Sequence, residues 1–199
     1  FIGEVSIIIQ NTPPSLSGVS IIPSGATFND DILTCSGSIT DPDEIPNISY
    51  EWSVSGSIIG NASTLDLTTT GIMPDDVLHC TITAIDSDGL MVTDSITKMI
   101  DNRAPTLSVL ISTNGTTNTG ELTCTATASD VDDLPISPIV SYEWFNAGGS
   151  LGITDQLQLD PNIGVDGDSI DCVVTAMDLS GVAVTDTASH IITKTPPVI

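Results

Sequence analysis

The chain has 199 residues, of which 26 are acidic and only three are Lys or Arg, so its formal net charge at pH 7 is −23. A nucleic acid or an anionic membrane surface requires a basic face on its partner, so this charge balance argues against both and permits cation binding. No segment approaches the roughly 18 consecutive apolar residues that span a membrane, so we expect no direct membrane insertion.

Short runs of β-branched and apolar residues, separated by Gly, Asn, Asp and Pro clusters, predict an all-β chain. Helical periodicity is almost absent. In chain order, the expected strands are 15–22, 31–39, 48–55, 63–69, 77–85 and 89–100, followed by 106–112, 120–129, 139–146, 155–160, 168–177 and 182–193.

These strands fall into two blocks that carry the same markers. Each block has a cysteine, then Tyr-Glu-Trp, then a second cysteine 28 residues after the tryptophan (Trp52 to Cys80, and Trp144 to Cys172). A proline-marked boundary recurs at 91- and 92-residue intervals, at Pro14, Pro105 and Pro197. A fixed period of this length predicts tandem copies of one small domain. We expect one repeat over 11–102, a second over 103–195, and the start of another at 196–199.

Residues 1–10 precede the first repeat, and their pattern predicts an orphan strand, meaning a strand that belongs to neither repeat. Val5, Ile7 and Ile9 alternate with other residues in a segment that precedes the first boundary, as 94–100 and 186–192 precede the later ones. We therefore expect the segment to belong to a sandwich upstream of residue 11. That sandwich is either an earlier repeat of the same chain or a domain of a neighbouring molecule, completed by strand donation.

Each repeat contains two cysteines, which suits one disulfide per domain. We expect the pairs Cys35–Cys80 and Cys124–Cys172, each of which would stabilise its small domain by roughly 3–4 kcal/mol in the chain-entropy model. Disulfides persist in oxidising compartments, so the chain is expected to be extracellular or to lie at a cell surface.

A cysteine on the second strand, a tryptophan on the third and a cysteine on the fifth are typical of an immunoglobulin-like sandwich. The chain resembles the tandem immunoglobulin-like or PKD-like β-sandwich repeats of large prokaryotic extracellular surface proteins. The motifs that carry this resemblance are Leu33-Thr34-Cys35, Tyr50-Glu51-Trp52, Cys80-Thr81-Ile82-Thr83-Ala84 and their second copies around Cys124, Trp144 and Cys172. The chain departs from antibody domains at the corner tyrosine, because Leu78 and Ile170 occupy that position.

An aspartate follows every cysteine by six residues, and two strands that run toward the same end bring each domain's pair to one tip. Further carboxylates lie beside them, including Glu44 and Asp133, and others flank the boundary between the repeats. Clustered oxygen ligands suit Ca²⁺, which would stiffen the interdomain junction by the logic of cadherins, although the cadherin motifs are not present. The alternative is that these are solvated turn residues. The predicted ligands are Asp41, Asp43, Asp75, Asp76, Asp86, Asp88, Asp101, Asn102, Asp130, Asp132 and Asp178.

No pattern in the sequence supports catalysis, and we expect the chain not to be an enzyme. His79 and His190 lie in strands of different repeats, and no nucleophile elbow occurs. Trp52 and Trp144 are expected to pack against the disulfides rather than to stack on sugars. Acceptor patterns for N-glycosylation begin at Asn47, Asn61 and Asn114.

These observations favour a structural repeat segment of an extracellular fibre, stalk or large surface adhesin. Its partners would be flanking repeats of the same chain or other copies of itself. One alternative is a self-assembling filament subunit joined by strand donation from residues 1–10. Another is a glycan-binding or accessory module of a secreted protein, which the small number of aromatic residues disfavours.

Overall fold

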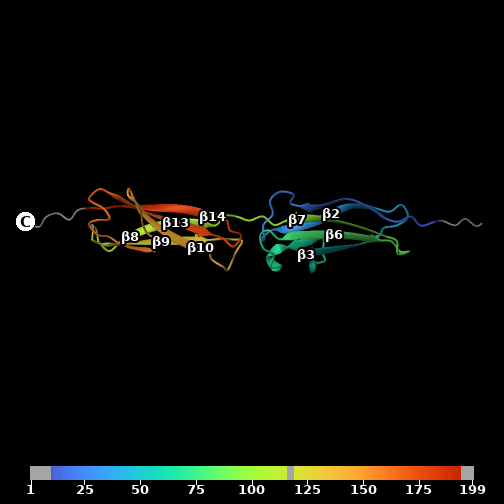
Figure 1. Cartoon of the computed structure of the whole chain (residues 1–199). Helices are drawn as coiled ribbons and strands as arrows, with labels where there is room; N and C mark the ends of the chain where they lie inside the picture. Colours follow the sequence, from blue (N-terminus) through green and yellow to red (C-terminus); the bar gives the residue numbers. More distant parts are fainter. Residues whose placement is uncertain (1–9, 116–118, 194–199) are drawn as a thin grey trace, which may run out of the picture. The chain divides into compact units, whose positions relative to one another are not determined.

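The computed structural model describes residues 10–115 and 119–193, and these residues form two compact units that divide between Asn102 and Arg103 (Figure 1). We call the units domain 1 and domain 2. Among the described residues, no helix is long and apolar enough to cross a membrane. The predicted orphan strand, apart from Gln10, and the predicted start of a further repeat at 196–199 lie outside the described residues.

Domain 1 is a sandwich of two antiparallel sheets. One sheet has the order β1-β2-β5, and the other has the order β4-β3-β6-β7. In chain order the elements are β1 (Ser15–Ile22), β2 (Ile32–Thr40), β3 (Asn47–Val54), β4 (Ser57–Gly60), β5 (Thr64–Asp66), a 3-10 turn η1 (Leu67–Thr69), β6 (Val77–Ile85) and β7 (Met91–Met99).

Domain 2 repeats this topology strand for strand, with sheets β8-β9-β12 and β11-β10-β13-β14. Its strands are β8 (Thr106–Thr113), β9 (Glu121–Ser129), β10 (Ile139–Asn146), β11 (Gly149–Gly152), β12 (Gln156–Gln158), β13 (Ser169–Met177) and β14 (Ala183–Ile191). The chain is therefore all-β and consists of two tandem immunoglobulin-like sandwiches, as the sequence predicts.

Two short strands, β4 and β11, were not predicted from the sequence. Each has four residues, contains glycine and follows a tight turn, so it carries too little alternation to be recognised. The predicted strand 63–69 is also shorter in the structure, because the Asp66 side chain accepts the N–H of Thr68 and caps the turn η1.

The core of each domain lies between its sheets. Along β6 the buried side chains are every second residue, Leu78, Cys80, Ile82 and Ala84, and β13 repeats this alternation. Trp52 is fully buried and its indole N–H donates to the carbonyl of Ala62 at 2.8 Å. Trp144 is equally buried and donates to Thr154 in the same way. Both tryptophans are therefore core residues, which confirms the prediction.

One disulfide joins the two sheets of each domain. Cys35 pairs with Cys80 and Cys124 pairs with Cys172, with the same Cα–Cα separation of 6.4 Å in both, and no cysteine is free. The predicted pairing is confirmed. Since the bridge connects β2 to β6, or β9 to β13, it links the centres of two facing sheets across the core.

Strand direction places the loops of each domain at two opposite ends. In domain 1, β1 begins where β2 and β6 finish, so the segment that leads into the domain meets the 41–46 and 86–90 loops at that end. β7 finishes at the other end, where the backbone of Asp101 bonds to Thr27. The chain therefore enters and leaves the domain at opposite ends, and domain 2 has the same arrangement.

Candidate metal centres

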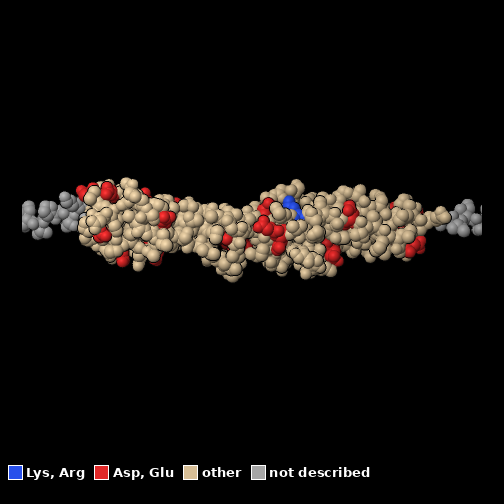
Figure 2. Space-filling model, viewed as in Figure 1, with Lys and Arg blue, Asp and Glu red and all other residues tan. Residues whose placement is uncertain are grey.

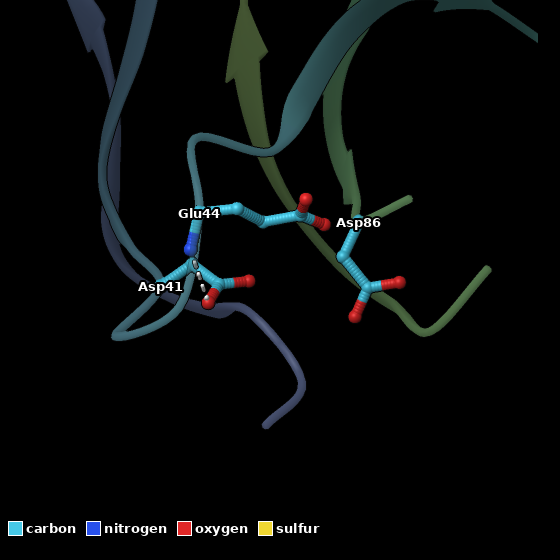
Figure 3. Close-up of side chains that lie close together, drawn as sticks. All are labelled: Asp41, Glu44 and Asp86. Carbon is cyan, nitrogen blue, oxygen red and sulfur yellow. Dashed lines mark hydrogen bonds between the residues drawn. The ribbon is translucent and has the colours of Figure 1, made fainter. Parts of the chain in front are cut away.

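The first candidate site is a group of carboxylates at the end of domain 1 where the chain enters. We call Asp41, Asp43, Glu44 and Asp86 the domain 1 tip cluster. The 41–46 loop folds around Asp41, whose Oδ1 accepts the N–H groups of Asp43 at 2.9 Å and Glu44 at 3.4 Å. This is an Asx-type turn, and it directs Glu44 toward the neighbouring 86–90 loop (Figure 3).

The 86–90 loop is held by the same cluster. The Glu44 carboxylate accepts both the N–H and the hydroxyl of Ser87. Asp86, which is only 6% exposed, accepts the N–H of Leu90 at 2.8 Å on one oxygen and the side-chain amide of Asn11 at 2.7 Å on the other. The carboxylates therefore connect two loops and the incoming segment of the chain.

Three carboxylates of the domain 1 tip cluster lie close enough together to contact one metal ion. One oxygen from each of Asp41, Glu44 and Asp86 lies within 4.8 Å of the other two. Ligand oxygens about 2.3–2.6 Å from a Ca²⁺ ion lie at most about 5 Å apart across it. The second oxygen of Asp41, Oδ2, is buried and accepts no hydrogen bond. The three carboxyl groups in Figure 3 surround a common space.

Domain 2 carries the corresponding carboxylates in a more buried form. Asp130, Asp132, Asp133 and Asp178, which we call the domain 2 tip cluster, are each at most 4% exposed. Arg103 donates to Asp132 twice, from its backbone N–H at 2.6 Å and from its guanidinium at 2.8 Å. A buried charge requires such a partner, because the cost of dehydrating an ion in the protein interior amounts to several kcal/mol.

The two clusters are built by the same contacts. Asp130 accepts the N–H of Asp132 at 2.8 Å, as Asp41 accepts that of Asp43. Asp133 accepts the N–H of Leu179 at 2.8 Å, in the role that Glu44 has in domain 1. Asp178 accepts the N–H of Val182 at 2.7 Å, as Asp86 accepts that of Leu90. The same loop architecture therefore appears twice in one chain.

Burial changes the acid strength of Asp130. Loss of hydration raises its pKa above the ordinary value, and the charges of Asp133, Asp132 and Asp178 raise it further, against a lowering by the hydrogen bond from the Asp132 backbone. The Asp130 carboxyl group therefore stays protonated to a higher pH in the folded domain than in the unfolded chain. Ionising Asp130 therefore costs folding free energy as the pH rises through that interval.

The structure separates the other predicted ligands from these clusters. Asp75, Asp76 and Asp101 lie at the end of domain 1 where the chain leaves, and Asp76 accepts the N–H of Met73 in the loop before β6. Asn102 is the last residue of domain 1. The idea that this set shares an ion with domain 2 stays a prediction.

Asp43 and Asp88, also predicted as ligands, are exposed in domain 1. Together with Gln10, Asn11 and Pro42 they line an open depression of about 430 Å³ at the same end of domain 1. Asp43 uses one oxygen to accept the N–H of Thr12 at 2.6 Å. Figure 2 shows acidic side chains spread over both domains and little basic surface on the visible face.

The predicted ligand set omitted two residues that the structure places within the clusters, Glu44 and Asp133. Each follows the first aspartate of its loop by three residues, in Asp41-Pro42-Asp43-Glu44 and in Asp130-Val131-Asp132-Asp133. The sequence already places both residues beside the tip aspartates, and this matched spacing was the signal that could have added them to the predicted ligands. The three predicted glycosylation acceptors, Asn47, Asn61 and Asn114, are exposed.

The sheets and the disulfides define the chain as a tandem pair of disulfide-linked immunoglobulin-like sandwiches. No protein-family model matches the chain, and a search of curated proteins found no match.

Three solved structures illustrate the likeness to known folds. The fibronectin(III)-like modules of CbhA from Clostridium thermocellum are 14% identical, with 89% of this chain and 95% of that chain covered and a TM-score of 0.30. The three N-terminal domains of the outer capsid protein Hoc of bacteriophage RB49 are 14% identical, with coverage of 92% and 71% and a TM-score of 0.35. The amphioxus IgVJ-C2 molecule is 15% identical, with coverage of 93% and 98% and a TM-score of 0.36.

Proposed function

We propose that this chain is a structural spacer segment of an extracellular fibre, stalk or large surface adhesin, without a catalytic role. The observation that carries the proposal is the path of the chain through each domain. It enters at one end of the sandwich and leaves at the other. A nine-residue strand such as β7 spans roughly 30 Å, so each domain adds a fixed length between its two attachment points.

The disulfides support this role. Each bridge ties the two sheets together across the core, so a force applied along the chain cannot extend the residues between the paired cysteines. Disulfides also require an oxidising compartment, which supports a location outside the cell. A load-bearing segment at a cell surface benefits from both properties.

The incoming segment is also fixed to its own domain. The backbone N–H of Thr12 bonds to Asp43, and Arg103 is tied to Asp132 by its backbone and by its side chain. These bonds hold the first residues of each domain against the tip of that same domain. Whether strand donation by residues 1–10 extends the assembly stays a prediction, because residues 1–9 lie outside the described chain.

The proposal predicts where the protein is found. An antibody raised against residues 10–193 should label intact, non-permeabilised cells that produce the protein, and immunogold particles should lie outside the cell boundary. Protease added to intact cells should remove the label, while a cytoplasmic marker protein remains protected. Labelling that appears only after permeabilisation would contradict a role in a surface fibre, stalk or adhesin.

A further inference from the structure

Two buried carboxylate oxygens in domain 2 accept no hydrogen bond, Oδ2 of Asp130 and Oδ1 of Asp133. Their side chains are only 3% and 2% exposed. In each case the other oxygen of the same carboxylate accepts a backbone N–H, so the loop geometry is already satisfied without these two atoms. A buried acceptor without a hydrogen bond costs the full free energy of its lost hydration. Native proteins contain few such atoms, and each usually has an identifiable cause.

The charges at this tip are also unbalanced. Arg103 is the only Lys or Arg between residues 99 and 193, and its guanidinium bonds to Asp132. Asp130 and Asp133 belong to the same loop, both are buried, and each keeps one carboxylate oxygen without a hydrogen bond. A buried carboxylate is neutralised either by a proton or by a cation.

Domain 1 repeats this feature independently. The corresponding atom, Oδ2 of Asp41, is likewise buried and without a hydrogen bond, in a group whose oxygens from Asp41, Glu44 and Asp86 fit within one coordination sphere (Figure 3). If these aspartates only formed solvated turns, there would be no reason for the same oxygen to lack a hydrogen bond in both domains. The recurrence therefore favours a ligand that both domains bind.

We propose that each domain binds one Ca²⁺ ion inside its own tip cluster. The ligands are Asp130, Asp133 and Asp178 in domain 2, and Asp41, Glu44 and Asp86 in domain 1. Only oxygen ligands are present in these clusters, which favours a hard cation over zinc or copper. Carboxylates that come from two separate loops suit the flexible coordination of Ca²⁺ better than the strict octahedron that Mg²⁺ demands, and water completes the coordination sphere.

This site differs from an ion shared across the domain boundary, because all the ligands of each ion belong to one domain. The ion joins the loop after β2 to the loop after β6, or the loop after β9 to the loop after β13. In domain 1, Asn11 donates to the ligand Asp86, so the incoming segment is held in the same network. The inference concerns these clusters alone and does not rest on the proposed spacer function.

The experiment uses the disulfide-intact two-domain chain, freed of metal by chelator and titrated with CaCl₂ in a calorimeter at constant ionic strength. The expected result is two bound Ca²⁺ ions per chain. At a free Ca²⁺ concentration 100 times the dissociation constant, the melting temperature of each domain should rise by roughly 10–20 °C. Mg²⁺ at the same concentration should give a much smaller rise, which separates coordination from screening.

Two variants and one control locate the site in domain 2. Asp130→Asn and Asp133→Asn should each abolish one of the two binding events. Without calcium, each should leave the melting temperature of domain 2 unchanged or raise it, because a buried charge has been removed. Asp186 is exposed on β14, so Asp186→Asn should keep both binding events and the full calcium-induced rise. In domain 1, Asp41→Asn and the exposed Asp94→Asn form the matched pair.

The calcium titration decides whether the tip clusters are calcium sites or only acidic turns. If wild-type protein shows no binding heat and no difference in melting temperature between Ca²⁺ and Mg²⁺, the clusters are acidic turns and the proposal fails. It fails equally if Asp186→Asn reduces the response to calcium as much as Asp130→Asn does. If Asp130→Asn does not fold, the wild-type titration and Asp133→Asn still give the answer.

Discussion

Replacing Cys124 and Cys172 together by alanine is expected to lower the free energy of unfolding of domain 2 by about 4 kcal/mol. The bridge closes a loop of 48 residues, and releasing such a loop raises the entropy of the unfolded chain by an amount worth about 4 kcal/mol at 25 °C. Both cysteines are also buried in the core, so the substitution removes packed sulfur atoms as well. Urea denaturation of the wild type and of the double variant measures the difference.

The matched control is the double replacement of Cys35 and Cys80 in domain 1. Its bridge closes 45 residues, so the same loss of about 4 kcal/mol should appear in the transition of domain 1 and leave that of domain 2 in place. A loss below about 1 kcal/mol in both variants would mean that the sandwiches do not depend on the disulfides, which would remove the main argument for an oxidising compartment.

The second large effect is expected at Arg103. The Asp132 side chain is fully buried and its Oδ1 accepts from the Arg103 guanidinium at 2.8 Å. Arg103→Ala leaves that carboxylate without its charged partner, and breaking a buried pair in this way costs about 3–5 kcal/mol. Since the Arg103 side chain is 31% exposed, water replaces part of the lost interaction and we expect the lower end, about 3 kcal/mol. Thermal unfolding of domain 2 measures the loss.

Domain 1 provides the control for this prediction. Thr12 stands where Arg103 stands in domain 2, but it is exposed and reaches Asp43 through its backbone N–H. Thr12→Ala should therefore change the stability of domain 1 by no more than about 0.5 kcal/mol. Adding Asp132→Asn to Arg103→Ala should recover part of the lost stability, because it removes the stranded charge. A loss of less than 1 kcal/mol for Arg103→Ala alone would show an ordinary surface ion pair.

Most of the fold could be predicted from the sequence because each structural marker occurs in both repeats. The position of Cys35 on β2, Trp52 on β3 and Cys80 on β6 follows from matched spacing, and the alternation in 77–85 gives the buried face of β6. The short strands β4 and β11 could not be predicted, since their pairing depends on a neighbouring strand rather than on their own pattern.

The candidate sites were predictable only in outline. The aspartates that follow each cysteine do come to one tip of each domain, because strand direction fixes where they lie. The sequence could not show that Glu44 crosses to the backbone of Ser87, or that Asp130 keeps one oxygen unpaired after its turn has formed. Those features depend on how two loops pack, which no local pattern encodes.

The proposed spacer function requires each disulfide-linked domain to carry force from one end to the other. Single-molecule stretching of the chain, held at its two termini, tests this directly. Two unfolding events are expected, and reduction should lengthen the extension released in each by roughly 150–170 Å, the span of the 45 and 48 residues that the bridges enclose. A smooth extension without discrete events, or event lengths that reductant does not change, would contradict the claim.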